Sequence, residues 1–138
     1  MASNTKVANI LRDYRDYTMI CAGVFDDMVA TLVLENKEAI LERNRQIIEE
    51  NLALMDEWIA KEPKASWIRP ASVSTSFVKL DVDRPIEVFA LELLQEYGVL
   101  VVPGNRFDKE SHVRIGYCCD KEVLQKGLEK LSQFLNKC

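Results

Sequence analysis

Apolar residues recur at helical spacing in the first half of the chain and at strand spacing in the second half. Residues 5–14 carry a short apolar face that predicts a helix, and the less regular residues 16–23 are interpreted as a link. Residues 24–34 are apolar nearly all round, a pattern typical of a helix that is buried on several sides. Because 138 residues leave little material to cover it, we expect this segment to pack against something larger.

A long amphipathic helix is predicted over residues 37–61, with Pro63 ending it. One side of this helix carries an apolar stripe, made of Leu41, Ile48, Leu52, Met55 and Ile59. At about 1.5 Å per residue the helix would run on the order of 35 Å, which favours a helix that bridges two bodies. A coiled coil is the alternative, although the stripe lasts barely three heptads.

The second half of the chain predicts strands and helices in turn. The expected elements are a strand over 73–80, a helix that starts at Pro85 and ends at Gly98, strands over 99–102 and 112–117, and a last helix capped by Asp120. The last helix has an apolar face, made of Val123, Leu124, Leu128, Leu131 and Leu135. This order predicts an α/β (α+β) sandwich, with a small sheet that has helices packed on one face and is preceded by the long inter-domain helix.

Composition and charge argue against several classes of function. A net charge of −4 and a pI near 5.1 argue against nucleic acid as the main partner, because a phosphate backbone needs a basic face. The chain has neither an apolar run long enough to cross a membrane nor a secretory signal, so a cytoplasmic location is expected. Cys118 and Cys119 are adjacent and His112 is the one histidine, so no metal site is expected.

The predicted strand 112–117 holds the most informative side chain. Alternation places Val113, Ile115 and Tyr117 on one face and Arg114 beside Gly116 on the other. Arginine offers a planar fork that can hold a carboxylate through two hydrogen bonds, and the neighbouring glycine would let a small anion approach. The alternative is an exposed arginine that pairs loosely with an acid such as Asp108 or Glu110.

The order of these segments is similar to one family. Residues 98–107, followed by 112–117 and a leucine-rich last helix, resemble the C-terminal signature of fold-type-I, class I/II pyridoxal-phosphate-dependent aminotransferases. Residues 15–23 are similar to the segment after the family's cofactor-lysine motif, and residues 43–52 resemble the helix that joins its two domains. The resemblance runs from about residue 10 to residue 135.

The resemblance implies a division of the chain and a role for one residue. Residues 1–35 would be the last helical segments of a truncated large domain, 36–62 the connecting helix and 63–138 the C-terminal small α/β domain. The family transfers an amino group between an amino acid and a 2-oxo acid on pyridoxal phosphate, usually as a homodimer. Arg114 matches the arginine that grips the α-carboxylate of the substrate.

The chain departs from the family at its cofactor segment. The Schiff-base lysine belongs before the Arg15–Thr18 stretch, where only Lys6 stands here, and the phosphate-site glycine–arginine pattern is missing too. We therefore expect the chain to be the C-terminal fragment of an aminotransferase, inactive alone, with no catalytic residue, no bound pyridoxal phosphate and a missing large domain as its partner. The alternatives are a stand-alone α/β module that binds a carboxylate or assists assembly without catalysis, and a structural protein built on the long helix.

Overall fold

The structure is a computed structural model that describes residues 4–19, 23–71 and 73–137. The chain divides into two compact units, Met1–Ile40 and Leu41–Cys138.

The first unit contains two helices. Helix α1 (Thr5–Thr18) begins after Asn4, whose side-chain oxygen accepts a hydrogen bond of 2.9 Å from the backbone N–H of Lys6. The helix is longer than predicted, because residues 16–18, interpreted as part of a link, are helical. Residues 20–22 of that link lie outside the described residues. Helix α2 (Val24–Glu35) buries none of its residues, and Phe25 is 84% exposed.

Helix α3 (Lys37–Lys61) has the bounds that the sequence predicts. Of the predicted stripe, Leu52 and Met55 are buried and Leu41 is exposed. Asn51 and Trp58 complete the buried side. The helix therefore contributes its C-terminal half to a core, while the start of the stripe is uncovered.

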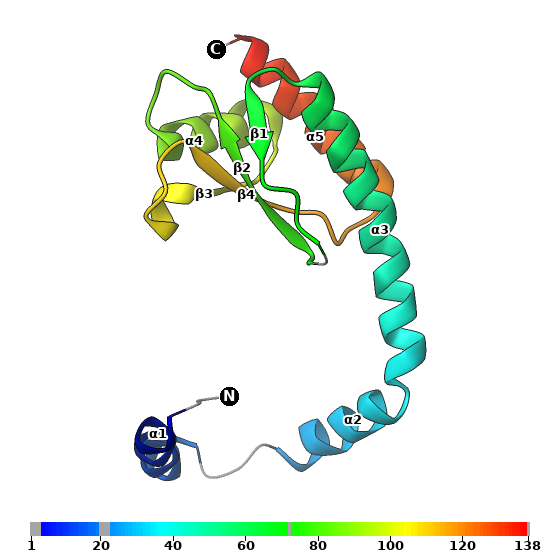
Figure 1. Ribbon diagram of the computed structural model, residues 1–138, viewed down its shortest axis with the longest axis vertical. Helices are drawn as coiled ribbons and strands as arrows, with labels where there is room; N and C mark the ends of the chain where they lie inside the picture. The colour runs from blue at the N-terminus through cyan, green and yellow to red at the C-terminus, as the bar shows by residue number, and fades with distance from the viewer. Residues whose placement is uncertain (1–3, 20–22, 72, 138) are drawn as a thin grey trace. The chain divides into compact units, whose positions relative to one another are not determined.

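The second unit holds a four-stranded sheet in which every neighbouring pair is antiparallel. Its strands are β1 (Ala65–Trp67), β2 (Thr75–Leu80), β3 (Val102–Pro103) and β4 (His112–Gly116), in the order β1-β2-β4-β3 (Figure 1). In the central pair, Phe77 lies opposite Arg114 and Val78 lies opposite Val113. The sequence did not predict β1, whose three residues are too few to show alternation.

The predicted strand 99–102 is wrong in its extent. Only Val102 of that run is in β3, and the next residue, Pro103, pairs with Val113. Leu100 of the same run is 76% exposed. A short 3-10 helix, η1 (Gly104–Phe107), follows β3 directly.

Two more helices cover the sheet. Helix α4 (Ile86–Tyr97) ends at Gly98, which adopts the left-handed conformation (φ 68°) predicted for a C-terminal cap. Helix α5 (Lys121–Lys137) begins after Asp120, whose Oδ1 accepts a hydrogen bond of 2.9 Å from the N–H of Glu122. The predicted apolar face of α5 is wrong at Val123, which is 62% exposed, and it omitted the buried Phe134.

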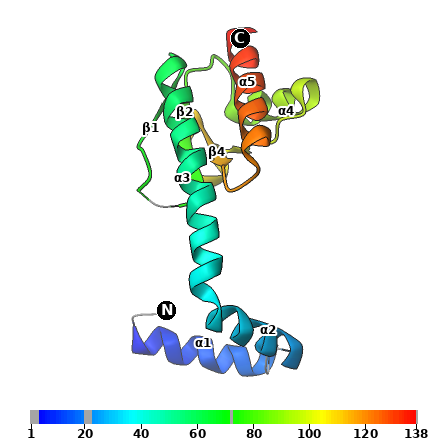
Figure 2. The same ribbon diagram turned by 90° about the vertical axis from the view of Figure 1, so that its right-hand side faces the viewer.

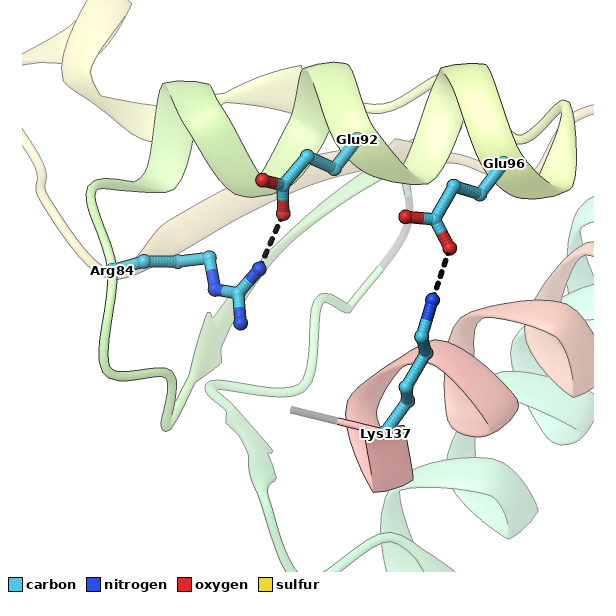
Figure 3. Close-up of polar contacts among 4 residues, drawn as sticks. All are labelled: Arg84, Glu92, Glu96 and Lys137. Atoms are coloured by element: carbon cyan, nitrogen blue, oxygen red, sulfur yellow. Dashed lines mark hydrogen bonds and ion pairs between the residues drawn. The ribbon is translucent and has the colours of Figure 1, made fainter.

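Two ion pairs join α4 to neighbouring segments. Arg84, in the loop before α4, pairs with Glu92, and Lys137 of α5 reaches Glu96 at 2.5 Å (Figure 3). These groups are all partly exposed, so each pair contributes less than about 1 kcal/mol. They help to orient α4, whose position is determined mainly by the burial of its apolar side chains.

One face of the sheet carries the core. Figure 2 shows α4 and α5 on the same side of the strands, and α3 packs its buried half into the same core. The fully buried residues of this core include Met55, Val78, Leu80, Phe89, Val113, Tyr117, Leu131 and Leu135. The predicted α/β sandwich, with helices on one face of a small sheet, is confirmed.

Two buried side chains of α3 donate hydrogen bonds to the rest of the unit. The buried amide of Asn51 donates hydrogen bonds to the carbonyls of Tyr117 (2.7 Å) and Cys119 (2.8 Å), just beyond β4. Near the end of α3, the indole N–H of Trp58 donates to Ser132 of α5 at 2.8 Å. The tie made by Asn51 sets the position of β4, which carries the candidate site.

Candidate functional site

Arg114 lies on the face of the sheet opposite the core. Val113, Ile115 and Tyr117 are buried, whereas Arg114 and Gly116 are exposed, as the alternation predicted. A central strand places Arg114 here, because β4 pairs with β2 on one side and with β3 on the other. The guanidinium is thus presented from a rigid element, with freedom only in its own side chain.

Two phenylalanine rings flank this arginine. A shallow pocket of about 270 Å³ is lined by Thr75, Ser76, Phe77, Phe107 and Arg114. The rings of Phe77 and Phe107 meet edge to face, with centroids 5.9 Å apart. The guanidinium carbon of Arg114 lies 5.4 Å from the centroid of Phe107, within the range of a cation–π contact. The rings supply an apolar wall beside a single positive charge.

His112 completes the aromatic group without forming a catalytic set. Its ring stacks on Phe77 at a centroid distance of 5.0 Å, and its Nδ1 lies 2.8 Å from the carbonyl oxygen of Glu110. The sequence named neither Phe77 nor Phe107 as a site residue. The available signal for Phe77 was its register opposite Arg114, which cannot be counted until the strands are paired.

The charge of Arg114 is not neutralised by a neighbouring acid. None of the ion pairs among the described residues includes Arg114, and neither Asp108 nor Glu110 reaches it. Glu87 of α4 pairs with Arg106 and not with Arg114. The guanidinium therefore keeps N–H donors that an incoming carboxylate can use.

The turn before β4 fixes the position of Phe107. At Gly104 a Cβ would lie 2.3 Å from the carbonyl oxygen of Lys109 and 2.6 Å from that of His112, so the turn closes too tightly for any side chain. Glu87 of α4 accepts hydrogen bonds from Asn105 (2.9 Å) and Arg106. The close approach at Gly104 and the acceptor at Glu87 together hold η1, and with it the ring that touches Arg114.

The pocket does not by itself fit pyridoxal phosphate. That cofactor needs a lysine amine for its Schiff base and an acid or base beside its pyridine nitrogen. Among the residues that line the pocket, none is a lysine or an acid. The donor set matches a small carboxylate instead, and Lys6 lies in the other compact unit.

The two described cysteines lie where β4 leads into α5. Cys118 is exposed, and Cys119 is partly buried. Burial raises the pKa of the Cys119 thiol, and the nearby Asp120 and Cys118 add to the rise. Among the described residues, no group of three His, Cys, Asp or Glu side chains could hold a metal ion. In the same part of the chain, no helix has the length and apolarity to cross a membrane.

Comparisons with known proteins agree on one family. The family model for aminotransferase class I and II matches residues 1–131. The chain is 28% identical over 122 residues to capreomycidine synthase from Streptomyces vinaceus, covering 88% of this chain and 31% of that protein. It is 37% identical over 70 residues to aspartate/prephenate aminotransferase from Thermus thermophilus, covering 51% of this chain and 18% of that protein.

Solved structures extend the likeness to the fold. A pyridoxal-phosphate-dependent aminotransferase from Streptococcus suis is 65% identical and superposes with a TM-score of 0.89, over 99% of this chain and 36% of that one. Aspartate aminotransferase from Thermotoga maritima is 26% identical with a TM-score of 0.78, over 95% of this chain and 33% of that one. The chain thus spans about a third of the length of these enzymes. It belongs to the class I and II aminotransferase family.

Proposed function

We propose that this chain is the C-terminal part of a pyridoxal-phosphate-dependent aminotransferase of fold type I, in which Arg114 binds the α-carboxylate of the substrate. Residues 63–138 would form the small domain, 36–62 the connecting helix and 1–35 the last segments of the large domain. The observation that carries the proposal is the Arg114 guanidinium, which contacts Phe107 and has no acid partner among the described residues.

The geometry supports a clamp for a carboxylate. Arg114 stays protonated at any working pH and can donate two parallel N–H bonds to the two oxygens of one carboxylate. The rings of Phe77 and Phe107 keep water away from one flank of the guanidinium, which strengthens an ionic hydrogen bond. An incoming anion therefore meets a cation that is oriented but not neutralised.

The reacting chemistry would be supplied by groups outside the pocket. Pyridoxal phosphate, when bound in the parent enzyme, acts as the electron sink for amino-group transfer between an amino acid and a 2-oxo acid. We expect its Schiff-base lysine to lie outside this chain, so that the chain alone is inactive. We also expect the parent to work as a homodimer in the cytoplasm.

The exposed side of α2 favours this proposal over a stand-alone binding module. Val24, Phe25, Met28 and Leu32 are each at least 60% exposed. An apolar surface of this kind marks a face that another body covers. A missing large domain would supply that body.

The decisive experiment changes Arg114 in the full-length parent enzyme. Arg114→Lys keeps the charge but loses the fork, so kcat/KM for the amino acid should fall about 10- to 100-fold, the equivalent of one strong hydrogen bond. Arg45→Lys is the matched control: it changes an exposed arginine of α3 that does not line the pocket, and it should leave kcat/KM within about twofold. Equal kinetics for wild type and Arg114→Lys would place the clamp elsewhere.

The expectation that this chain has no Schiff-base lysine can be tested on the isolated chain. Incubation with pyridoxal phosphate and borohydride should label surface lysines weakly and without preference, because no lysine here is expected to form a lasting Schiff base. Stoichiometric reduction onto one lysine, mapped by mass spectrometry, would show that the chain holds its own cofactor site.

A further inference from the structure

A second hollow, separate from the one at Arg114, gathers basic side chains. It encloses about 610 Å³, and Lys79, Lys109 and His112 line it, whereas Arg114 does not. Lys79 and His112 share the open face of the sheet with Arg114, because they alternate with buried neighbours. We name this hollow the lysine pocket. Its volume lies within the range of roughly 300–1,000 Å³ that is typical of sites for small organic molecules.

Ordered backbone carries these basic side chains. Lys79 belongs to β2, which lies between β1 and β4 in the sheet, and it pairs in register with His112. Lys109 lies in the turn before β4, where its backbone N–H donates to the carbonyl oxygen of Gly104 at 3.0 Å. The fold therefore brings the three side chains to one hollow from fixed positions of the main chain.

The two lysines of the pocket differ from the other lysines of their compact unit. Among the described residues, the ammonium groups of Lys79 and Lys109 take part in no ion pair and no hydrogen bond. Every other lysine of this unit has a carboxylate or a backbone carbonyl as its partner: Lys61, Lys64, Lys121, Lys126, Lys130 and Lys137. Two lysines without an acid thus lie in one hollow of a chain whose net charge is −4.

The rest of the lining supplies hydrogen-bond donors and an apolar wall. Among the described residues that line the lysine pocket, none is an aspartate or a glutamate, and Ser66 and Thr75 contribute hydroxyl groups. The Nδ1 of His112 lies 2.8 Å from the carbonyl oxygen of Glu110. Because a carbonyl oxygen only accepts, Nδ1 carries a proton and Nε2 is the nitrogen left for a ligand. The ring of Phe77 forms part of the wall.

Two carboxylates suit this arrangement better than one phosphate. A lysine ammonium is a compact charge on a flexible stem, and the two lysines come from different segments, so each can pair with a carboxylate of its own. Phosphate sites are typically built from backbone N–H groups at a helix N-terminus or in a glycine-rich loop. The described lining of the lysine pocket contains neither a glycine nor the start of a helix.

We propose that the lysine pocket binds a small organic acid with two or more carboxylates, at a site separate from the Arg114 clamp. Lys79 and Lys109 would each pair with one carboxylate, and the hydroxyl groups of Ser66 and Thr75 would donate to the remaining oxygens. This site goes beyond the proposed function, because it involves neither the cofactor nor the amino-acid substrate. The ligand would contact Thr75 and other residues that line both hollows.

Isothermal titration calorimetry of the 138-residue chain with citrate tests the proposal. Citrate carries several carboxylates and has neither an amino group nor a 2-oxo group, so it is not a substrate for amino-group transfer. At low ionic strength, where ion pairs are least screened, citrate should bind at one site. The double variant Lys79→Gln/Lys109→Gln should raise the Kd at least about tenfold, because both ammonium groups are lost. A wild-type chain that does not bind citrate would overturn the proposal.

A second double variant controls for net charge. Lys121→Gln/Lys126→Gln removes the same two positive charges from lysines of α5 that do not line the lysine pocket, and it should leave the Kd within about twofold. All four lysines are exposed, so both double variants are expected to fold. Equal losses of affinity in the two variants would mean that citrate responds to net charge alone, and the proposal would be wrong.

The clamp and the lysine pocket are distinguished by Arg114→Lys. This variant should leave the Kd of citrate within about twofold, because Arg114 does not line the lysine pocket and its charge is kept. Citrate binding that is lost in Arg114→Lys and kept in Lys79→Gln/Lys109→Gln would place the acid at the clamp and overturn the proposal. The kinetics of Arg114→Lys in the parent enzyme report the clamp alone, so either proposal can fail without the other.

Discussion

Tyr117 has a buried hydroxyl that makes no hydrogen bond with the described residues. Its side chain is 0% exposed, and burial raises the pKa of the phenol above its ordinary value of 10.0, an effect that Arg69 partly offsets. A raised pKa means that the folded state favours the neutral phenol. The stability this contributes is complete below pH 10 and is lost as pH rises from 10 through the folded-state value.

We expect Tyr117→Phe to be neutral, or stabilising by up to about 1 kcal/mol, at pH 7, because it removes an unsatisfied buried group. The advantage over wild type should grow at about pH 11, where the wild-type phenol ionises on unfolding. Urea denaturation at both pH values measures this. The raised pKa of the Cys119 thiol acts in the same direction, so the variant still loses some stability at alkaline pH.

Tyr14→Phe, at an exposed ring, is the control and should not change stability at pH 7. A destabilised Tyr117→Phe would reveal a partner for the hydroxyl.

At Gly104 the absence of a side chain allows the tight turn before β4. We expect Gly104→Ala to lower the free energy of unfolding by about 1–3 kcal/mol, because the new methyl group overlaps two backbone carbonyl oxygens. Gly127→Ala should instead raise it by about 1 kcal/mol, because nothing crowds that position. Thermal unfolding of the two variants compares them directly. If both are stabilised, the turn at Gly104 opens more easily than its contacts indicate.

Among the helices and strands, the sequence predicted those features that depend on patterns of neighbouring residues. The bounds of α3, the cap at Gly98 and the alternation of β4 follow from periodicity and cap residues close in the chain. Strand β1 and the end of β3 depend on pairing with distant residues, which no local pattern contains. The site divides in the same way: Arg114 was predicted, whereas Phe77 and Phe107 join it only through register and a tight turn.

The hydrogen bonds of Asn51 join α3 to the residues just beyond β4. We expect Asn51→Ala to cost on the order of 2 kcal/mol, because the carbonyls of Tyr117 and Cys119 lose a shared buried donor. Asn44→Ala, one more asparagine of the same helix, should cost less than about 0.5 kcal/mol. Chemical denaturation of both variants measures the two changes in the free energy of unfolding. Similar losses would mean that the tie is not the cause of the effect, because the higher helix propensity of alanine would by itself stabilise both variants.

For the molecule as a whole, the core belongs to one of its two units. The buried apolar residues of this core run from Leu52 to Leu135, all within Leu41–Cys138, while α2 buries none of its own. We therefore expect a chain of residues 41–138 to unfold cooperatively, with a free energy of unfolding within about 1 kcal/mol of that of the 138-residue chain. It should also self-associate less, because the exposed apolar residues of α2 are gone. Urea denaturation and sedimentation velocity measure the two effects. A loss of cooperative unfolding on removal of residues 1–40 would mean that α1 and α2 stabilise the core through contacts of their own, and the apolar face of α2 would then need no large domain to explain it.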